Sequence, residues 1–368
     1  MTHARTRALH DLGQSLWLDN ITRDMLDDGT LAGIIDAYSV TGLTSNPTIF
    51  EKAIGGGDAY DAQIGELARA GHSGEALFTE LALADLRRAA DLFRPIHEAT
   101  DGVDGFVSLE VSPLLVDDAR RTTEVAARLH REVERSNVFI KIPGTTAGNR
   151  AIEDSIFAGV PINVTLLFSR EHYLASAEAY LRGIERRLAA GLDPKVESVA
   201  SLFVSRWDVA VQDKVPKRLR NRLGIAIAGR TYKAYRDLLA SPRWQALAEQ
   251  GARPQRLLWA STGTKDPDAP PTLYVDALAA PDTVNTLPGK TLEAYAEQGA
   301  AATPMARDGG DAEAVLAEFQ AAGVDVDALA ARLQKEGAAS FAKSWKALLA
   351  GIEAKTKQLA GSAGAAGA

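Results

Sequence analysis

The sequence contains no cysteine, which excludes disulfide bonds and thiol chemistry. Its apolar runs are far shorter than the ~18 residues that a membrane-spanning helix needs. The first residues, 1–5, lack the apolar core of a signal peptide. No block of basic residues is present, which argues against a nucleic-acid partner. Together these absences predict a cytoplasmic protein with neither membrane nor nucleic acid as a partner.

Two phosphate-binding signatures are also missing. No G-x-G-x-x-G follows the first expected strand, and the triglycine at residues 55–57 lacks the flanking strand and the Lys-Ser/Thr pair of a P-loop. We interpret these three glycines as a flexible turn. The 41 basic and 48 acidic residues give a net charge of -7, so an anionic substrate needs local arginine or lysine.

The 368 residues are 46% hydrophobic and 24% charged, which is ordinary for a globular protein. Eight short apolar runs read as strands, and helical patterns separate most of them. The expected strands cover residues 15–18, 39–44, 105–111, 137–142, 161–166, 199–204, 256–261 and 282–287. This alternation predicts the α/β class and a (β/α)8 TIM-type barrel, with an open doubly wound sheet as the alternative.

Helical apolar periodicity recurs between and after these strands. It covers residues 22–38 with an interruption near Gly29, 51–100, 122–134, 149–157, 171–190, 224–251 with a break at Ser241-Pro242, 312–322 and 325–351. We expect residues 1–360 to form a single barrel domain with additional, chiefly C-terminal helices. Residues 361–368 contain only Gly, Ala and Ser, which predicts a mobile tail. The sequence leaves monomer and homodimer open.

Lys141 is a lone charge in an apolar run that ends at Pro143-Gly144. The β-branched and aromatic residues beside it predict a buried strand, and lysine is almost never fully buried without a partner or a task. Partial desolvation favours the neutral amine, which is a nucleophile for a ketone carbon. The alternative is a strand-end lysine whose ammonium reaches solvent.

Polar side chains recur at the carboxyl ends of the expected strands, and in a barrel these ends share one face. They are Asp19, Asn46, Glu110, Lys141, Asn163, Thr165, Arg206 and Ser261. A single strand-end Asp, Asn or Ser is commonly a turn residue or a helix cap, whereas Glu110 and Asn163 precede further strand-like residues and are expected to point inward. An amine, carboxylates, amides, hydroxyls and a guanidinium together predict carbonyl chemistry through an imine on a phosphorylated substrate.

Five motifs resemble those of the transaldolase family and match it in order, over roughly residues 15–300. They are residues 44–48 (TSNPT), 139–143 (FIKIP), 162–169 (INVTLLFS), 201–206 (SLFVSR) and 259–265 (WASTGTK). The segment NVTLLFS is highly characteristic of the family. The chain resembles the longer bacterial form of these enzymes.

The resemblance implies an enzyme without metal or organic cofactor that transfers a dihydroxyacetone unit between sugar phosphates in the non-oxidative pentose phosphate pathway. The implied donor is sedoheptulose 7-phosphate or fructose 6-phosphate, and the implied acceptor is glyceraldehyde 3-phosphate or erythrose 4-phosphate. The resemblance assigns the Schiff base to Lys141 and proton transfer to Asp19, Glu110 and Thr165. The substrate-binding residues that it implies are Asn46, Asn163, Ser201, Phe203, Arg206 and Ser261.

The phosphate is expected at Arg206, because a planar guanidinium can bind phosphate oxygens bidentately. In shorter members of the family a second arginine lies two residues after the strand-seven serine, a position that is Gly263 in this chain. Lys265 is the nearest substitute, and we predict it as the second cation. The alternatives are an ion pair between Arg206 and Asp208 and a solvated loop lysine at position 265.

Two other functions remain open from the sequence. An aldolase of the same barrel type would release dihydroxyacetone instead of passing it on, or would cleave a different sugar phosphate. A barrel that only binds sugar phosphates, as a sensor or scaffold, would need no chemistry, because a fold alone does not prove an activity. The intact set of Asp19, Glu110 and Lys141 argues against the second alternative.

Overall fold

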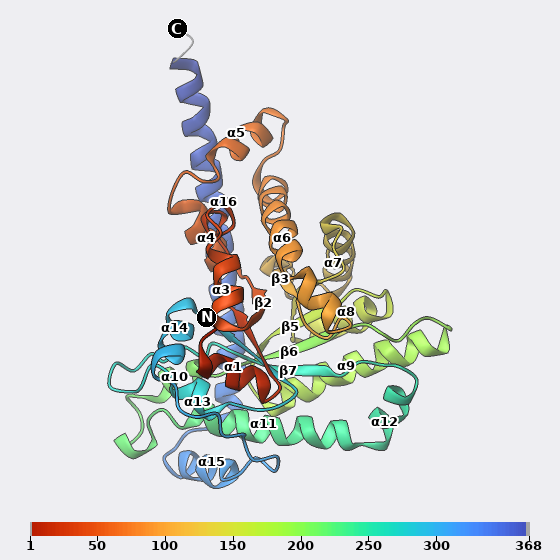
Figure 1. Cartoon of the computed structure of the whole chain (residues 1–368), viewed down its shortest axis with the longest axis vertical. Coiled ribbons are helices and arrows are strands. Elements are labelled where there is room, and N and C mark those ends of the chain that lie inside the picture. Colours follow the sequence, from red (N-terminus) through yellow and green to blue (C-terminus); the bar gives the residue numbers. More distant parts are fainter. Residues whose placement is uncertain (1, 366–368) are drawn as a thin grey trace.

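The computed structural model describes residues 2–365, with side chains through residue 361, and its centre is a closed barrel of eight parallel strands (Figure 1). The strands are β1 (Gln14–Leu18), β2 (Val40–Thr44), β3 (Val107–Glu110), β4 (Val138–Pro143), β5 (Ile162–Leu167), β6 (Ser198–Phe203), β7 (Gln255–Ala260) and β8 (Thr283–Leu287). Because β1 pairs with both β2 and β8, the sheet has no edge. The predicted (β/α)8 barrel is confirmed, and the doubly wound alternative is wrong.

Helices connect the strands and surround the barrel. They are α1 (Ala4–Asp11), α2 (Arg23–Asp27), α3 (Thr30–Tyr38), α4 (Pro47–Gly55), α5 (Asp61–Arg69), α6 (Gly74–Ala99), α7 (Ala119–Val133), α8 (Thr146–Phe157), α9 (Arg170–Ala189), α10 (Ser205–Val211), α11 (Leu223–Ala240), α12 (Pro242–Glu249), α13 (Leu273–Ala277), α14 (Gly289–Gln298), α15 (Ala312–Ala321) and α16 (Val326–Ala365), with 3₁₀ turns η1 (Pro113–Leu115) and η2 (Lys217–Leu219). The breaks predicted near Gly29 and at Ser241-Pro242 separate α2 from α3 and α11 from α12. Helices α1, α10, α13 and α14 were not predicted.

Side-chain caps fix where the chain turns from strand to helix. Asn46 caps α4, Thr145 caps α8 and Ser169 caps α9, each by accepting a backbone N–H of the first helical turn. These helices follow β2, β4 and β5 within a few residues. The strand ends at this face of the barrel are therefore held in short, well-defined turns, which is the arrangement that positions side chains for chemistry.

The opposite, amino-terminal end of the barrel is closed by a buried polar network. Arg256 donates to Ser15 Oγ at 2.7 Å, Trp17 Nε1 donates to Asp104 Oδ1 at 2.8 Å, and Ser15 also donates to Asp104. A Cβ at Gly42 would lie 2.6 Å from Trp17 Nε1, so only glycine fits beside this indole. These groups are partners of one another, and they hold the amino-terminal ends of β1 and β7 against the segment that precedes β3.

The C-terminal helix α16 is 40 residues long and contacts α4, α5, α6, η1 and β5. Figure 1 shows it (blue) passing the barrel and running beside α4, with its last turns projecting from the body. The helix continues past the predicted end at Gly351 and includes the first part of the predicted tail, and residues 366–368 of that tail lie outside the described residues. Within residues 2–365, no helix has the length and apolarity needed to span a bilayer.

Candidate active site

The register of three neighbouring strands places an acid, an amine and an amide side by side. Glu110 of β3 lies opposite Lys141 of β4, and Lys141 lies opposite Asn163 of β5. All three residues are buried, with 4%, 5% and 0% of their surface exposed. Since residues in register on parallel strands point to the same side of a sheet, these three form a row inside the carboxyl end of the barrel. The inward orientation expected for Glu110 and Asn163 agrees with their burial.

The Lys141 amine is held by two groups from other strands. Its Nζ donates a hydrogen bond to the Ser45 carbonyl oxygen at 3.0 Å and lies 3.6 Å from Glu110 Oε2. Ser45 follows β2, so the amine spans the barrel interior from β4 toward β2 and β3. The side chain does not reach solvent, which contradicts the alternative of an ammonium extended into water. A buried amine next to a carboxyl group is the arrangement in which a proton can move between the two.

The carboxyl group of Glu110 has a pKa close to neutral pH. Burial raises its pKa to about 7, the Lys141 charge and contact partly oppose that rise, and the Asp19 charge adds to it. Both carboxyl oxygens of Glu110 and the Thr165 hydroxyl are buried and have no hydrogen-bond partner among the described residues. Buried polar groups normally have a partner, so this acid and this hydroxyl are free to serve a substrate. A group with a pKa near 7 can both give and take a proton at physiological pH.

A second carboxyl group, Asp19, lies just past the end of β1 with partial access from the barrel mouth. Burial raises its pKa, while the charges of Lys141 and Lys265 and a hydrogen bond from Thr44 oppose the rise. The Thr44 hydroxyl lies 2.7 Å from Asp19 Oδ1 and 2.6 Å from the hydroxyl of Thr286 on β8. The carboxyl group is therefore oriented by β2 and β8 and lies within the field of two amines.

The two amides lie in different surroundings. Asn46 Oδ1 accepts from the Ile49 backbone N–H at 3.1 Å, so the helix-cap interpretation of this residue is correct, and its amide NH₂ is the end left for a ligand. Asn163 is bonded at both ends: Nδ2 donates to Ser108 Oγ at 3.2 Å, and Oδ1 accepts from Ser201 Oγ at 2.7 Å. Asn163 and Ser201 thus belong to one buried chain across β3, β5 and β6, and their contact with a substrate stays a prediction.

Arg206 is a half-buried cation without an acidic partner in the described part of the chain. It lies in the first turn of α10, its guanidinium carbon is 5.1 Å from the centre of the Phe203 ring, and burial is the cause that lowers its pKa. The alternative of an ion pair with Asp208 is wrong. Asp208 instead accepts backbone N–H bonds at the start of α11 and a hydrogen bond from Tyr274. An arginine desolvated without a counter-charge is suited to bind an anion.

Ser261 and Lys265 follow β7, and Ser261 lies beside the turn that carries Arg206. Ser261 has a left-handed backbone with φ of 56°, and its hydroxyl lies 2.9 Å from that of Ser205. Lys265 is exposed, yet its Nζ lies 3.8 Å from the place where a Cβ at Gly263 would be. Its charge also reaches Asp19, where it is the smallest of the contributions that oppose the rise in pKa caused by burial. The lysine is therefore solvated but folds back over the site, into the region that a side chain at position 263 would enter.

We compared the chain with known protein families and with individual proteins. A family model described as Transaldolase/Fructose-6-phosphate aldolase matches residues 16–352. A protein named Transaldolase from Thermobifida fusca is 47% identical over 350 residues, 93% of this chain and 95% of that protein. Proteins named Transaldolase from Neisseria gonorrhoeae and Transaldolase 2 from Nostoc sp. are 44% and 40% identical, over 92% and 95% of this chain and 97% of each relative.

The chain belongs to the transaldolase/fructose-6-phosphate aldolase family. This confirms the resemblance inferred from the five motifs. It also confirms that the chain is an enzyme of this family, a transferase.

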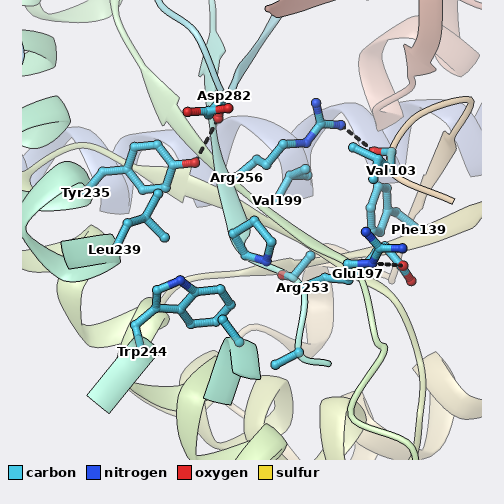
Figure 2. Close-up of a pocket in the computed structure, with 14 residues that line it drawn as sticks. Val103, Phe139, Glu197, Val199, Tyr235, Leu239, Trp244, Arg253, Arg256 and Asp282 are labelled. Atoms are coloured by element: carbon cyan, nitrogen blue, oxygen red, sulfur yellow. Dashed lines mark hydrogen bonds and ion pairs between the residues drawn. The ribbon is translucent and has the colours of Figure 1, made fainter. Parts of the chain in front are cut away.

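A cavity of about 450 Å³ lies near the amino-terminal ends of the strands, and Figure 2 shows residues that line it. None of the three residues of the reactive row lines this cavity. Apolar residues such as Trp244 and Leu239 line it together with Arg253 and Arg256. Both arginines are already engaged: Arg253 pairs with Asp101, and Arg256 is part of the network that closes the barrel floor. This cavity offers no free cation to a phosphate. Within residues 2–365, no group of three His, Cys, Asp or Glu side chains is arranged to hold a metal ion.

Sequence reasoning missed several residues that shape the transaldolase-family site. Thr44 and Ser45 stand inside the TSNPT motif, where the sequence predicts only a strand residue and a turn residue. The structure shows that the Thr44 hydroxyl donates a hydrogen bond to Asp19 and that the Ser45 carbonyl oxygen accepts one from Lys141. Gln334 and Phe341 of α16 contact the same end of the barrel. The apolar pattern of α16 predicted a helix, but no local signal told which of its residues meet the site.

The raised pKa of Glu110 predicts a pH-dependent stability difference between wild type and Glu110→Gln. Below the ordinary value of 4.5 the carboxyl group is protonated in both the folded and the unfolded chain. Between pH 4.5 and about 7 the Glu110 carboxyl group is ionised in the unfolded chain but still protonated in the folded chain. Its contribution to the free energy of unfolding therefore falls as pH rises through this window. The amide does not titrate. The free energy of unfolding of Glu110→Gln should therefore rise relative to wild type across this window.

Urea denaturation of both proteins at about pH 5 and about pH 8 measures this difference. Asp19 titrates in both proteins, so the difference between them reports on Glu110. A stability difference that stays the same at the two pH values would contradict the raised pKa.

Proposed function

We propose that this family member is a transaldolase that transfers a dihydroxyacetone unit through a Schiff base on Lys141. The donor is a ketose phosphate such as sedoheptulose 7-phosphate or fructose 6-phosphate, and the acceptor is an aldose phosphate such as glyceraldehyde 3-phosphate or erythrose 4-phosphate. These are the substrates of the non-oxidative pentose phosphate pathway. The observation that carries the proposal is the 3.6 Å approach of Lys141 Nζ to Glu110 Oε2, both buried at the carboxyl end of the barrel.

The first step forms the imine. The Lys141 amine, after losing a proton, attacks C2 of the ketose, and the carbonyl oxygen takes up protons and leaves as water. Glu110 is the acid and base for these transfers, because its pKa of about 7 lets it give and accept protons at neutral pH. The unpartnered Thr165 hydroxyl supports a role in holding a water molecule that relays the proton. The product is an iminium between Lys141 and C2.

The second step breaks the C3–C4 bond. Asp19 takes the proton of the C4 hydroxyl, C4 becomes an aldehyde, and the bonding electrons move into the iminium, which becomes an enamine on Lys141. The Thr44 hydrogen bond orients the Asp19 carboxylate for this task, and the positive charges of Lys141 and Lys265 favour its ionised form. The departing aldose phosphate carries C4 and the carbons beyond it.

The third step is transfer. The enamine attacks the aldehyde carbon of an acceptor, a new C–C bond forms, and hydrolysis of the iminium frees the new ketose phosphate and restores Lys141. Burial of the amine and of Glu110 keeps the enamine away from bulk water, which would otherwise protonate it. The amides of Asn46 and Asn163 are proposed to hold the hydroxyl groups of the retained fragment.

A related Schiff-base aldolase such as fructose 6-phosphate aldolase is the second candidate, because the family model that matches the chain includes that activity. The two enzymes share the imine and differ in the fate of the enamine. The aldolase protonates it and releases free dihydroxyacetone, whereas the transaldolase keeps it until an acceptor arrives. A barrel that only binds sugar phosphates would form no imine.

The activity is tested by the dependence on an acceptor. Glyceraldehyde 3-phosphate release from fructose 6-phosphate should be strongly stimulated by erythrose 4-phosphate, with sedoheptulose 7-phosphate as the second product. Lys141→Arg should lose at least about 10³-fold of this activity while keeping its fold, because a guanidinium stays charged and cannot attack a carbonyl. Release of free dihydroxyacetone at an undiminished rate without acceptor would favour the aldolase.

The phosphate is assigned to Arg206, with Lys265 as a second cation. The absence of an acidic partner for Arg206 within the described residues and the position of Lys265 Nζ beside Gly263 support this assignment. Ser261 lies between the two in the chain and supplies a hydroxyl at the end of β7. Because the net charge is -7, these cations are what makes the barrel mouth attractive to a sugar phosphate.

Arg206→Ala should raise KM for fructose 6-phosphate by about 10- to 100-fold, the loss expected for one or two charge-assisted hydrogen bonds. The slow use of unphosphorylated fructose should hardly change, since the lost contact is with the phosphate. Lys265→Ala should show a smaller effect of the same kind, because Lys265 is exposed. The measurement compares kcat/KM for the two sugars in wild type and both variants. Equal losses on both sugars would mean that Arg206 serves the fold or the chemistry instead.

A further inference from the structure

The C-terminal helix α16 is tied to the rim of the barrel by Gln334. Its Nε2 donates to two backbone carbonyl oxygens, those of Gly144 at 3.1 Å and of Leu166 at 3.0 Å. Gly144 directly follows β4 and Leu166 is part of β5, so one side chain joins α16 to two of the three strands that carry the reactive row. The helix is therefore attached to the active end of the barrel and not only to the outer helices.

The backbone of β5 is irregular at Leu166. This residue has a left-handed backbone with φ of 59°, and the pairing of β5 with β6 shifts register between Val164 and Leu167. A non-glycine residue in this region is uncommon and needs support from its surroundings. Gln334 supplies part of that support through the Leu166 carbonyl. The irregular end of β5, which carries Thr165, is thus one surface on which α16 rests.

Helix α16 also contacts the side chain of Arg206. A Cβ at Gly337 would lie 3.3 Å from Arg206 Nη1 and 2.9 Å from Leu166 Cδ2. One turn further along, the centre of the Phe341 ring lies 6.0 Å from the Arg206 guanidinium carbon, and Phe203 of β6 lies on the same cation at 5.1 Å. The guanidinium is bordered by two aromatic rings and a glycine. An aromatic face attracts a cation without using up its hydrogen bonds.

We infer that Gly337 and Phe341 are positioning residues for Arg206, so that α16 helps determine the preference for phosphorylated substrates. This inference rests on the proposed function, because it assigns α16 a role at the phosphate site of that reaction. Glycine at position 337 lets the helix approach until the guanidinium has little room to turn. Phe341 gives the guanidinium a flat contact, which restrains a long side chain and leaves its N–H groups free for the phosphate.

Gly337→Ala is the most direct test, and Gly351→Ala is its matched control. Both glycines lie in α16, but a Cβ at Gly351 meets nothing within 4 Å. Alanine favours a helix over glycine at either position, so neither change should lower the stability of the helix by itself. Only the Gly337 change adds an atom in tight contact with Arg206 Nη1 and Leu166.

We expect Gly337→Ala to raise KM for fructose 6-phosphate about tenfold, the equivalent of about one lost hydrogen bond to the phosphate. Its kcat and its use of unphosphorylated fructose should match those of Gly351→Ala. The inhibition constant of inorganic phosphate, used as a competitive probe, should rise by the same factor. Phe341→Leu, which keeps an apolar side chain but removes the ring, should change these constants in the same direction.

Arg206→Ala, measured alongside, separates this inference from the proposed function. One outcome is that Arg206→Ala selectively weakens the binding of fructose 6-phosphate and inorganic phosphate while Gly337→Ala and Phe341→Leu behave like Gly351→Ala. In that case the inference about α16 is wrong, and Arg206 remains the phosphate site. If Arg206→Ala itself shows no selective effect, the phosphate assignment fails first. Equal losses of Gly337→Ala on fructose and fructose 6-phosphate would also overturn the inference, because α16 would then act on the chemistry and not on phosphate recognition.

Discussion

The structure depends on one buried contact, between the amine of Lys141 and the carboxyl group of Glu110. Taking an amine and an acid out of water is costly, and such a pair is retained only when the surrounding structure holds it in place. The closed barrel does this through the register of its strands, which puts Glu110 opposite Lys141. The same burial that makes the pair costly raises the pKa of Glu110 to about 7. The energetic cost and the chemical capability therefore have one cause.

The rest of the site is arranged around this contact by groups that already satisfy one another. Thr44 and Thr286 orient Asp19 from β2 and β8, and the Ser108–Asn163–Ser201 chain fixes the interior across β3, β5 and β6. At the amino-terminal end, Arg256 and Asp104 are held in one network with Ser15 and Trp17. At the carboxyl end, Glu110 and Thr165 keep buried oxygens without a hydrogen-bond partner among the described residues, and Arg206 has no acidic partner there. An acid, a hydroxyl and a cation that lack such partners and lie at the same end of the barrel mark the reactive face.

Much of the fold and part of the site could be predicted from local sequence. Short β-branched runs bounded by turns gave the order of strands, and a lone lysine followed by Pro143-Gly144 marked the end of β4, because these signals act over a few residues. The inward orientation of Glu110 followed from the residues after it. What could not be predicted depends on contacts between distant segments. Gln334 reaches Leu166 across 168 positions in the chain, and nothing near either residue in the sequence announces that hydrogen bond.

Two findings that local sequence did not settle have the same origin. Asp208 stands two residues from Arg206 and was the alternative ionic partner for it, but the start of α11 and Tyr274 hold that carboxylate in the folded chain. Residues 205–211 and 289–298 were not predicted as helices, because tertiary packing can stabilise short segments whose own sequence pattern is weak. Local pattern therefore gives the barrel and its reactive strand ends, whereas partners and supports require the structure.

In the proposed reaction, the buried amine of Lys141 is the group that bonds to the substrate. The most direct measurement is mass spectrometry of the intact protein after incubation with fructose 6-phosphate and borohydride, followed by peptide mapping. We expect one covalent adduct per chain, carried by the peptide that contains Lys141 and absent in Lys141→Arg. A stable adduct on any other lysine, or none on a chain that turns over substrate, would contradict it.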